Sequence, residues 1–132
     1  MTLSVSHTTV DARNAYQQSV WWAEVLGYAE NPDDPNLAGH EECMIDSGDR
    51  NHKILFIEVP EAKQVKNRLH FDLQPTDATR EEEIERVRRL GATDVADLRQ
   101  PDGRGFLVLA DPEGNEFCIL RSQAEREAVG DL

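Results

Sequence analysis

The sequence predicts an α+β fold made of two βαβββ modules, and two observations lead to this prediction. First, each half of the chain has the same order: a β-rich segment, an amphipathic helix followed by glycine, and further β-rich segments. Second, a histidine lies in the first strand of each half, with His7 20 positions before Gly27 and His70 21 positions before Gly91. Two copies of one plan, each about 60 residues long, indicate two modules paired in one domain.

In the first half, a strand is expected over residues 3–10, where β-branched residues partly alternate with polar ones. The apolar stripe of the next segment predicts a helix that carries Trp22 and ends with Gly27 as its C-cap. Residues 31–39 are rich in proline, aspartate and asparagine and therefore predict a loop. Three strands should follow the helix, and the two clear candidates are residues 42–46 and 53–59.

The second half repeats this order. A strand is expected over residues 68–73, where apolar and polar residues alternate cleanly. Thr79 and Glu82 have the spacing of a capping box and predict the start of a helix, which should end before Gly91. The last three strands are expected over residues 93–98, 105–110 and 116–120.

Length and composition suit one globular domain. The chain has 132 residues, of which 39% are hydrophobic and 30% are charged. We expect a single domain over residues 1–121, with the first module in about 1–60 and the second in about 67–121. Residues 122–132 are expected to form a polar C-terminal tail.

Charge, hydropathy and cysteine content narrow the function classes. The net charge of −12 argues against nucleic acid and anionic membrane surfaces as partners. No apolar run approaches the roughly 20 residues of a membrane helix, and residues 1–20 lack a signal pattern. Cys43 and Cys118 form no disulfide framework, which favours reduced thiols in the cytoplasm. The chain is therefore expected to be a cytoplasmic enzyme or a small-molecule binding module.

Three segments resemble the vicinal oxygen chelate (VOC) superfamily, and most closely its bacterial glyoxalase-like domains (the glyoxalase/bleomycin resistance/dioxygenase type). Residues 20–28, Val-Trp-Trp-Ala-Glu-Val-Leu-Gly-Tyr, are similar to the end of that family's first helix. Residues 59–73 are similar to its inter-module segment, and residues 111–120, Asp-Pro-Glu-Gly-Asn-Glu-Phe-Cys-Ile-Leu, to its closing hairpin. The resemblance covers about residues 3–121. It implies a cupped mixed sheet around a central cleft, a small-molecule ligand in that cleft, and a homodimer.

The resemblance also implies metal ligands at His7, His70 and Cys118. Cys118 stands where catalytic members of the family carry a liganding glutamate. Glu116 lies two residues earlier, so strand alternation places it on the same face, and it is the candidate catalytic proton carrier. Imidazole and thiolate groups would suit one divalent ion such as Zn, Mn, Ni or Fe.

Three further residues are candidates for ligand binding. Trp22 and Phe56 are aromatic side chains that can line a cleft, and Trp22 matches the family's aromatic position at the helix end. Asp72 lies two residues after His70 in an expected strand, hence on the same face, where it can orient the imidazole or line the cleft.

The residues leave three hypotheses open. In the first, the site holds a metal and supports lyase or isomerase chemistry on a carbonyl compound. In the second, the cleft binds an organic molecule without metal, as antibiotic-binding resistance proteins do. In the third, both histidines are structural. Isomerisation of methylglyoxal is not expected, because Cys118 replaces the carboxylate that it requires. Whether the chain is an enzyme is left undecided, and small-molecule binding is the common expectation.

Overall fold

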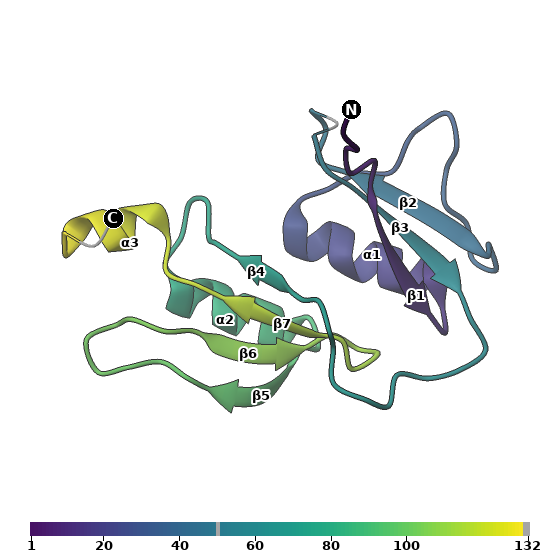
Figure 1. Ribbon diagram of the computed structural model, residues 1–132. Coiled ribbons are helices and arrows are strands. Elements are labelled where there is room, and N and C mark those ends of the chain that lie inside the picture. The colour runs from purple at the N-terminus through teal and green to yellow at the C-terminus, as the bar shows by residue number, and fades with distance from the viewer. Residues whose placement is uncertain (50, 131–132) are drawn as a thin grey trace. The chain divides into compact units, whose positions relative to one another are not determined.

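The computed structural model describes residues 1–49 and 51–130. The chain divides into two compact units, Met1–Ala62 and Lys63–Leu132. Each has its own sheet, with α1 in the first unit and α2 and α3 in the second (Figure 1). The two mixed sheets have three and four strands, which confirms the predicted α+β class. None of the described helices is long and apolar enough to cross a membrane.

The first unit is a three-stranded sheet with one helix against it. Its strands lie in the order β1-β3-β2, with β3 parallel to β1 and antiparallel to β2. Helix α1 contacts all three strands (Figure 1). The bounds are β1 Thr8–Ala12, α1 Ala15–Leu26, β2 Glu42–Asp46 and β3 Lys53–Glu58.

The two faces of the first sheet differ in burial. Ile54 and Phe56 of β3 are completely buried, and Trp22 of α1 is buried with 3% of its surface exposed. Leu55 and Ile57, which alternate with them along β3, are only half-buried. Strand alternation therefore separates a core face, packed against α1, from a more open face.

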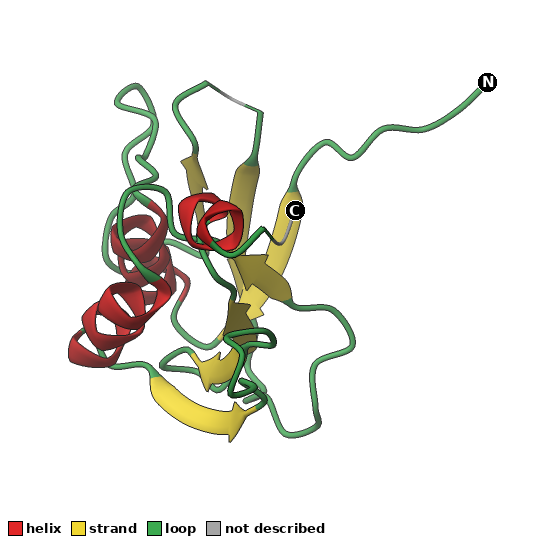
Figure 2. Ribbon diagram, turned by 90° about the vertical axis from the view of Figure 1, so that its left-hand side faces the viewer, coloured by secondary structure: helices red, strands yellow, loops and turns green. Residues whose placement is uncertain are grey.

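Two elements of the first unit differ from the prediction. The first strand begins at Thr8 rather than at residue 3, because its partner β3 begins only at Lys53. Just before β3 the chain turns away, and the Ser47 N–H is bonded to the His52 carbonyl at 3.0 Å. The residues before Thr8 form an extended loop (Figure 2). The additional strand expected after the helix is reduced to a single bridge between Ala29 and Asp46.

The second unit has a four-stranded sheet in the order β4-β7-β6-β5. Strands β4 and β7 are parallel, whereas β7, β6 and β5 are antiparallel to their neighbours. Helix α2 starts with the predicted capping box, in which Thr79 and Glu82 satisfy each other's backbone N–H groups. The bounds are β4 Phe71–Leu73, α2 Arg80–Arg89, β5 Thr93–Asp97, β6 Leu107–Ala110, β7 Glu116–Ile119 and α3 Gln123–Ala128.

The C-terminal residues, expected as a polar tail, contain the short helix α3, which is tied to the start of α2. Glu125 Oε1 accepts hydrogen bonds from the backbone N–H of Ser122 at 3.0 Å and of Arg80 at 2.7 Å. One carboxylate therefore caps both helices. Residues 131–132 of the expected tail lie outside the described residues.

Candidate functional site

Four polar side chains share one face of the second sheet, and strand register explains why. Asp72 of β4 lies beside Cys118 of β7 in the parallel pair. Glu116 is two residues before Cys118 along β7 and so belongs to the same face. His70 lies just before β4, which begins at Phe71 rather than at residue 68 as expected, and the 3.2 Å distance from its Nε2 atom to Asp72 places it beside the same residues. Phe117, which alternates with these residues on β7, is 1% exposed and belongs to the core. The parallel register therefore joins the two predicted pairs, His70 with Asp72 and Glu116 with Cys118, on one side of the sheet.

Three of these side chains form a compact cluster. The donor atoms of His70, Asp72 and Cys118 all lie within 4.8 Å of one another. The Nε2 atom of His70 is 3.2 Å from Oδ1 of Asp72, and both side chains are about half exposed. The carboxylate thus fixes the orientation of the imidazole, as in many metal and acid–base sites.

The cysteine of this cluster is held as a neutral thiol. Cys118 is 3% exposed. Burial raises the pKa of its thiol, and the charge of Asp72 and a hydrogen bond to that carboxylate raise it further, to about 11. At neutral pH the thiol is protonated, so it becomes a metal ligand only if the ion displaces the proton.

Glu116 belongs to a different arrangement on the same face. Its carboxylate lies 2.6 Å from the Nζ atom of Lys66 and 3.5 Å from that of Lys63. The hydrogen bond from Lys66 and the charges of both lysines hold the pKa of Glu116 below its ordinary value. A lowered pKa makes a carboxylate a weaker base, so the proposed proton transfer by Glu116 would first require its release from the lysines.

The other candidate residues lie in the first unit. His7 is half-buried immediately before β1, with its Nδ1 atom 3.0 Å from the Ser6 hydroxyl. Trp22 and Phe56 are core side chains, 3% and 0% exposed. The cluster around Cys118 therefore assembles within the second unit alone, and the roles of His7, Trp22 and Phe56 stay predictions.

The two lysines were not among the predicted site residues. Lys63 and Lys66 lie in the connecting segment, about 50 positions before their partner Glu116. Asn67 of the same segment donates a hydrogen bond from Nδ2 to the Glu116 carbonyl at 3.1 Å. In the sequence they are two of 14 basic residues, and nothing about their position indicates Glu116 as their partner.

Comparison with known families now identifies the fold. A family model described as a glyoxalase-like domain matches residues 7–120. The chain belongs to the glyoxalase-like domain family. The predicted membership of the VOC superfamily is thereby confirmed, and the matched region contains both modules. No curated protein sequence matches this glyoxalase-like chain significantly.

Solved structures show the same fold at low sequence identity. FosX, a fosfomycin resistance protein from Mesorhizobium loti, is 21% identical, with a TM-score of 0.67 over 97% of this chain and 99% of that one. A mutant FosX from Listeria monocytogenes, complexed with Mn(II) and 1S,2S-dihydroxypropylphosphonic acid, is 18% identical, with a TM-score of 0.67 over 96% and 95%. A glyoxalase/bleomycin resistance protein/dioxygenase family enzyme from Burkholderia phytofirmans PsJN is 22% identical, with a TM-score of 0.62 over 86% and 94%.

Proposed function

We propose that this glyoxalase-like protein binds a small organic ligand beside a divalent metal ion held by His70 and Cys118. The observation that carries the proposal is the clustering of His70, Asp72 and Cys118 donor atoms within 4.8 Å on one sheet face. His7, at the matching place in the first module, is the proposed further ligand. The FosX structure with Mn(II) supports a metal in this fold, although it concerns another protein.

The chemistry of the donor set fits a borderline divalent ion. Imidazole nitrogen, carboxylate oxygen and thiolate sulfur are the common ligands of zinc, whereas a wholly oxygen-based site would favour a harder ion. Asp72 either completes the ligand set or orients the His70 imidazole from its position at 3.2 Å. When bound, the ion would polarise a carbonyl oxygen of the ligand, which is the proposed basis of lyase or isomerase chemistry.

A second candidate, a binding protein that needs no metal, is favoured by one specific observation. The Cys118 thiol has a pKa of about 11 and is hydrogen-bonded to Asp72, while Asp72 also contacts His70. The cluster is therefore satisfied by its own members at neutral pH. Without a metal, the protein would bind its ligand but not transform it, and would act as an antibiotic-binding resistance protein does.

Both candidates predict that methylglyoxal is not the substrate. The strand position that should carry a carboxylate holds Cys118, and the neighbouring Glu116 is paired with Lys63 and Lys66. Protein loaded with Ni or Zn should show no glutathione-dependent turnover of the hemithioacetal. Both cysteines are free thiols, which supports the proposed reducing, cytoplasmic setting. The homodimer is proposed only because the family resemblance implies it.

Elemental analysis of the purified, untagged protein distinguishes the candidates. About one transition metal ion per chain, absent from His70→Ala and reduced in His7→Ala, is the expected result for the metal site. His40→Ala is the matched control, because His40 is exposed and outside the cluster. A wild type that stays metal-free after incubation with Zn, Mn, Ni and Fe would refute the metal site and leave the binding protein.

A further inference from the structure

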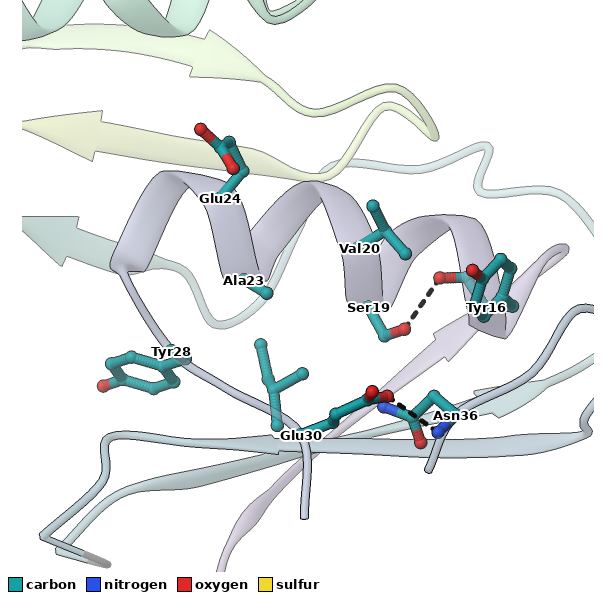
Figure 3. A pocket seen from close by; sticks show the side chains of 9 residues that line it. Tyr16, Ser19, Val20, Ala23, Glu24, Tyr28, Glu30 and Asn36 are labelled. Atoms are coloured by element: carbon teal, nitrogen blue, oxygen red, sulfur yellow. Dashed lines mark hydrogen bonds between the residues drawn. The ribbon is translucent and has the colours of Figure 1, made fainter. Parts of the chain in front are cut away.

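The first unit contains a cavity that the proposed function does not use. It has a volume of about 320 Å³, at the small end of the range for organic ligands. It lies between one side of α1 and the segment that leads from the helix to β2 (Figure 3). Helix α1 contributes Tyr16, Ser19 and Ala23 to its lining, and the chain after the helix contributes Tyr28, Glu30 and Asn36.

Hydrogen bonds hold the wall opposite the helix in place. Asn36 pairs with the edge strand β2 through its side chain, donating from Nδ2 to the Met44 carbonyl at 2.8 Å and accepting at Oδ1 from the Met44 N–H at 3.3 Å. Its own N–H donates to Glu30 Oε2 at 2.8 Å, as Figure 3 shows. Because the wall is already ordered, a ligand would lose little binding free energy in ordering it.

The cavity combines an aromatic and apolar lining with negative charge. The hydroxyl of Tyr28 is bonded to Nδ1 of His52 at 2.7 Å, which leaves its ring to face the cavity. Val20, Ala23 and Ile45 add apolar surface. In the part of the chain that the structure describes, no lysine or arginine is paired with the Glu30 carboxylate.

The charge of the whole first unit reinforces this preference. Residues 1–62 contain 11 aspartate and glutamate residues but only three lysine and arginine residues. Two of the acidic residues, Asp33 and Asp34, lie in the same segment as Glu30. The resulting negative potential raises the local concentration of cations and repels anionic ligands.

We infer that this cavity is a binding site for a small organic cation, an amine with a compact apolar or aromatic body. Its ammonium group would pair with the Glu30 carboxylate, and its body would contact the tyrosine rings and the apolar side of α1. This site is separate from that of the proposed function. Ile45 places it on the helix-covered face of the first sheet, and none of the proposed metal ligands, His7, His70 and Cys118, lines the cavity.

Nuclear magnetic resonance titration of the full ¹⁵N-labelled chain tests the inference, with phenethylamine as the cationic probe and phenethyl alcohol as its neutral counterpart. The amine should shift the backbone amides of Ser19, Ala23 and Asn36 in a saturable way. Glu30→Gln should weaken its binding about tenfold, since the acceptor to Asn36 is kept while the charge is lost. The matched control is Asp33→Asn, an exposed carboxylate of the same segment that does not line the cavity.

A second variant tests the position of the site without touching its charge. Ala23→Leu keeps a good helix former on α1 and fills the cavity from the helix side, so it should abolish binding of the amine. The inference is overturned if no cavity amide shifts in the wild type, if the alcohol binds as well as the amine, or if Glu30→Gln and Asp33→Asn behave alike. Unchanged binding in a folded Ala23→Leu protein would overturn it as well.

Discussion

Replacement of Asp72 by asparagine should make the Cys118 thiol markedly more acidic. In the wild type, burial is the largest cause of the raised pKa of this thiol, and the charge and hydrogen bond of Asp72 are the next two. Asparagine has nearly the same shape but no charge. The Asp72→Asn variant should therefore lose the electrostatic part of the effect and keep the part caused by burial.

The size of the effect follows from the pKa itself. The thiol moves from an ordinary pKa of 9.0 to about 11, so at a pH below both values its thiolate fraction is about 100-fold lower than that of an unperturbed cysteine. In Asp72→Asn, the pKa should fall below about 11 but stay above 9.0, because Cys118 remains 3% exposed. The rate of alkylation at mildly alkaline pH should rise accordingly.

Peptide-resolved alkylation with iodoacetamide, followed by mass spectrometry in the presence of a chelator, measures this rate for each cysteine separately. Cys43 provides an internal reference, since it is completely buried and far along the chain from Asp72. Asp102→Asn is the matched control, an exposed carboxylate of the same unit that pairs with Arg104. An alkylation profile of Cys118 that is the same in Asp72→Asn and in the wild type would refute the reasoning.

Three further predictions concern stability and are measured by urea unfolding. Gly105→Ala should lower the free energy of unfolding by several kcal/mol, because the new Cβ would lie 2.1 Å from the Leu98 carbonyl oxygen. Gly114→Ala is the control: its φ is similar but no atom lies near the new Cβ, so the loss should be about 1 kcal/mol. Equal losses in the two variants would contradict the steric argument. Phe56→Ala should cost about 3–5 kcal/mol as a completely buried side chain, and a loss under about 1 kcal/mol would remove Phe56 from the core. Glu125→Gln should cost about 1 kcal/mol near neutral pH. Burial raises the pKa of Glu125, but the hydrogen bonds that its carboxylate accepts outweigh burial and hold the pKa below 4.5. The difference in unfolding free energy between the wild type and Glu125→Gln should therefore disappear as the pH falls through the folded pKa. A difference that does not change with pH would show that the charge is not involved.

The sequence predicted best the features that depend on neighbours in the chain. The capping box of Thr79 and Glu82 and the C-cap at Gly27, with φ of 69°, need only a few consecutive residues, and both are confirmed. Strand alternation likewise predicted the common face of His70 and Asp72, since their spacing of two residues fixes it. The family resemblance supplied the expectation that Cys118 belongs to the same site, and the parallel pairing of β4 with β7 is how the structure brings it there.

Features that depend on distant partners could not be predicted in this way. The length of β1 is set by where β3 begins, so the β-rich residues before Thr8 remain without a strand partner in the described residues. The ion pairs of Glu116 join it to Lys63 and Lys66 across a long stretch of chain. The wall of the first-unit cavity likewise depends on the side-chain pairing of Asn36 with β2, which a loop composition does not reveal.

The net charge of −12 describes the whole chain but not its individual sites. On the open face of the second sheet, Cys118 is neutral and the two lysines outnumber the single carboxylate of Glu116 that they contact. In the cluster of His70, Asp72 and Cys118, Asp72 is the negative group, and it lies beside His70. The overall charge therefore argues against extended polyanions as partners, yet it does not exclude a small neutral or anionic ligand at this face. Around Glu30 in the first unit, no such neutralising lysine or arginine pair is found among the described residues, and selection for cations is expected there instead.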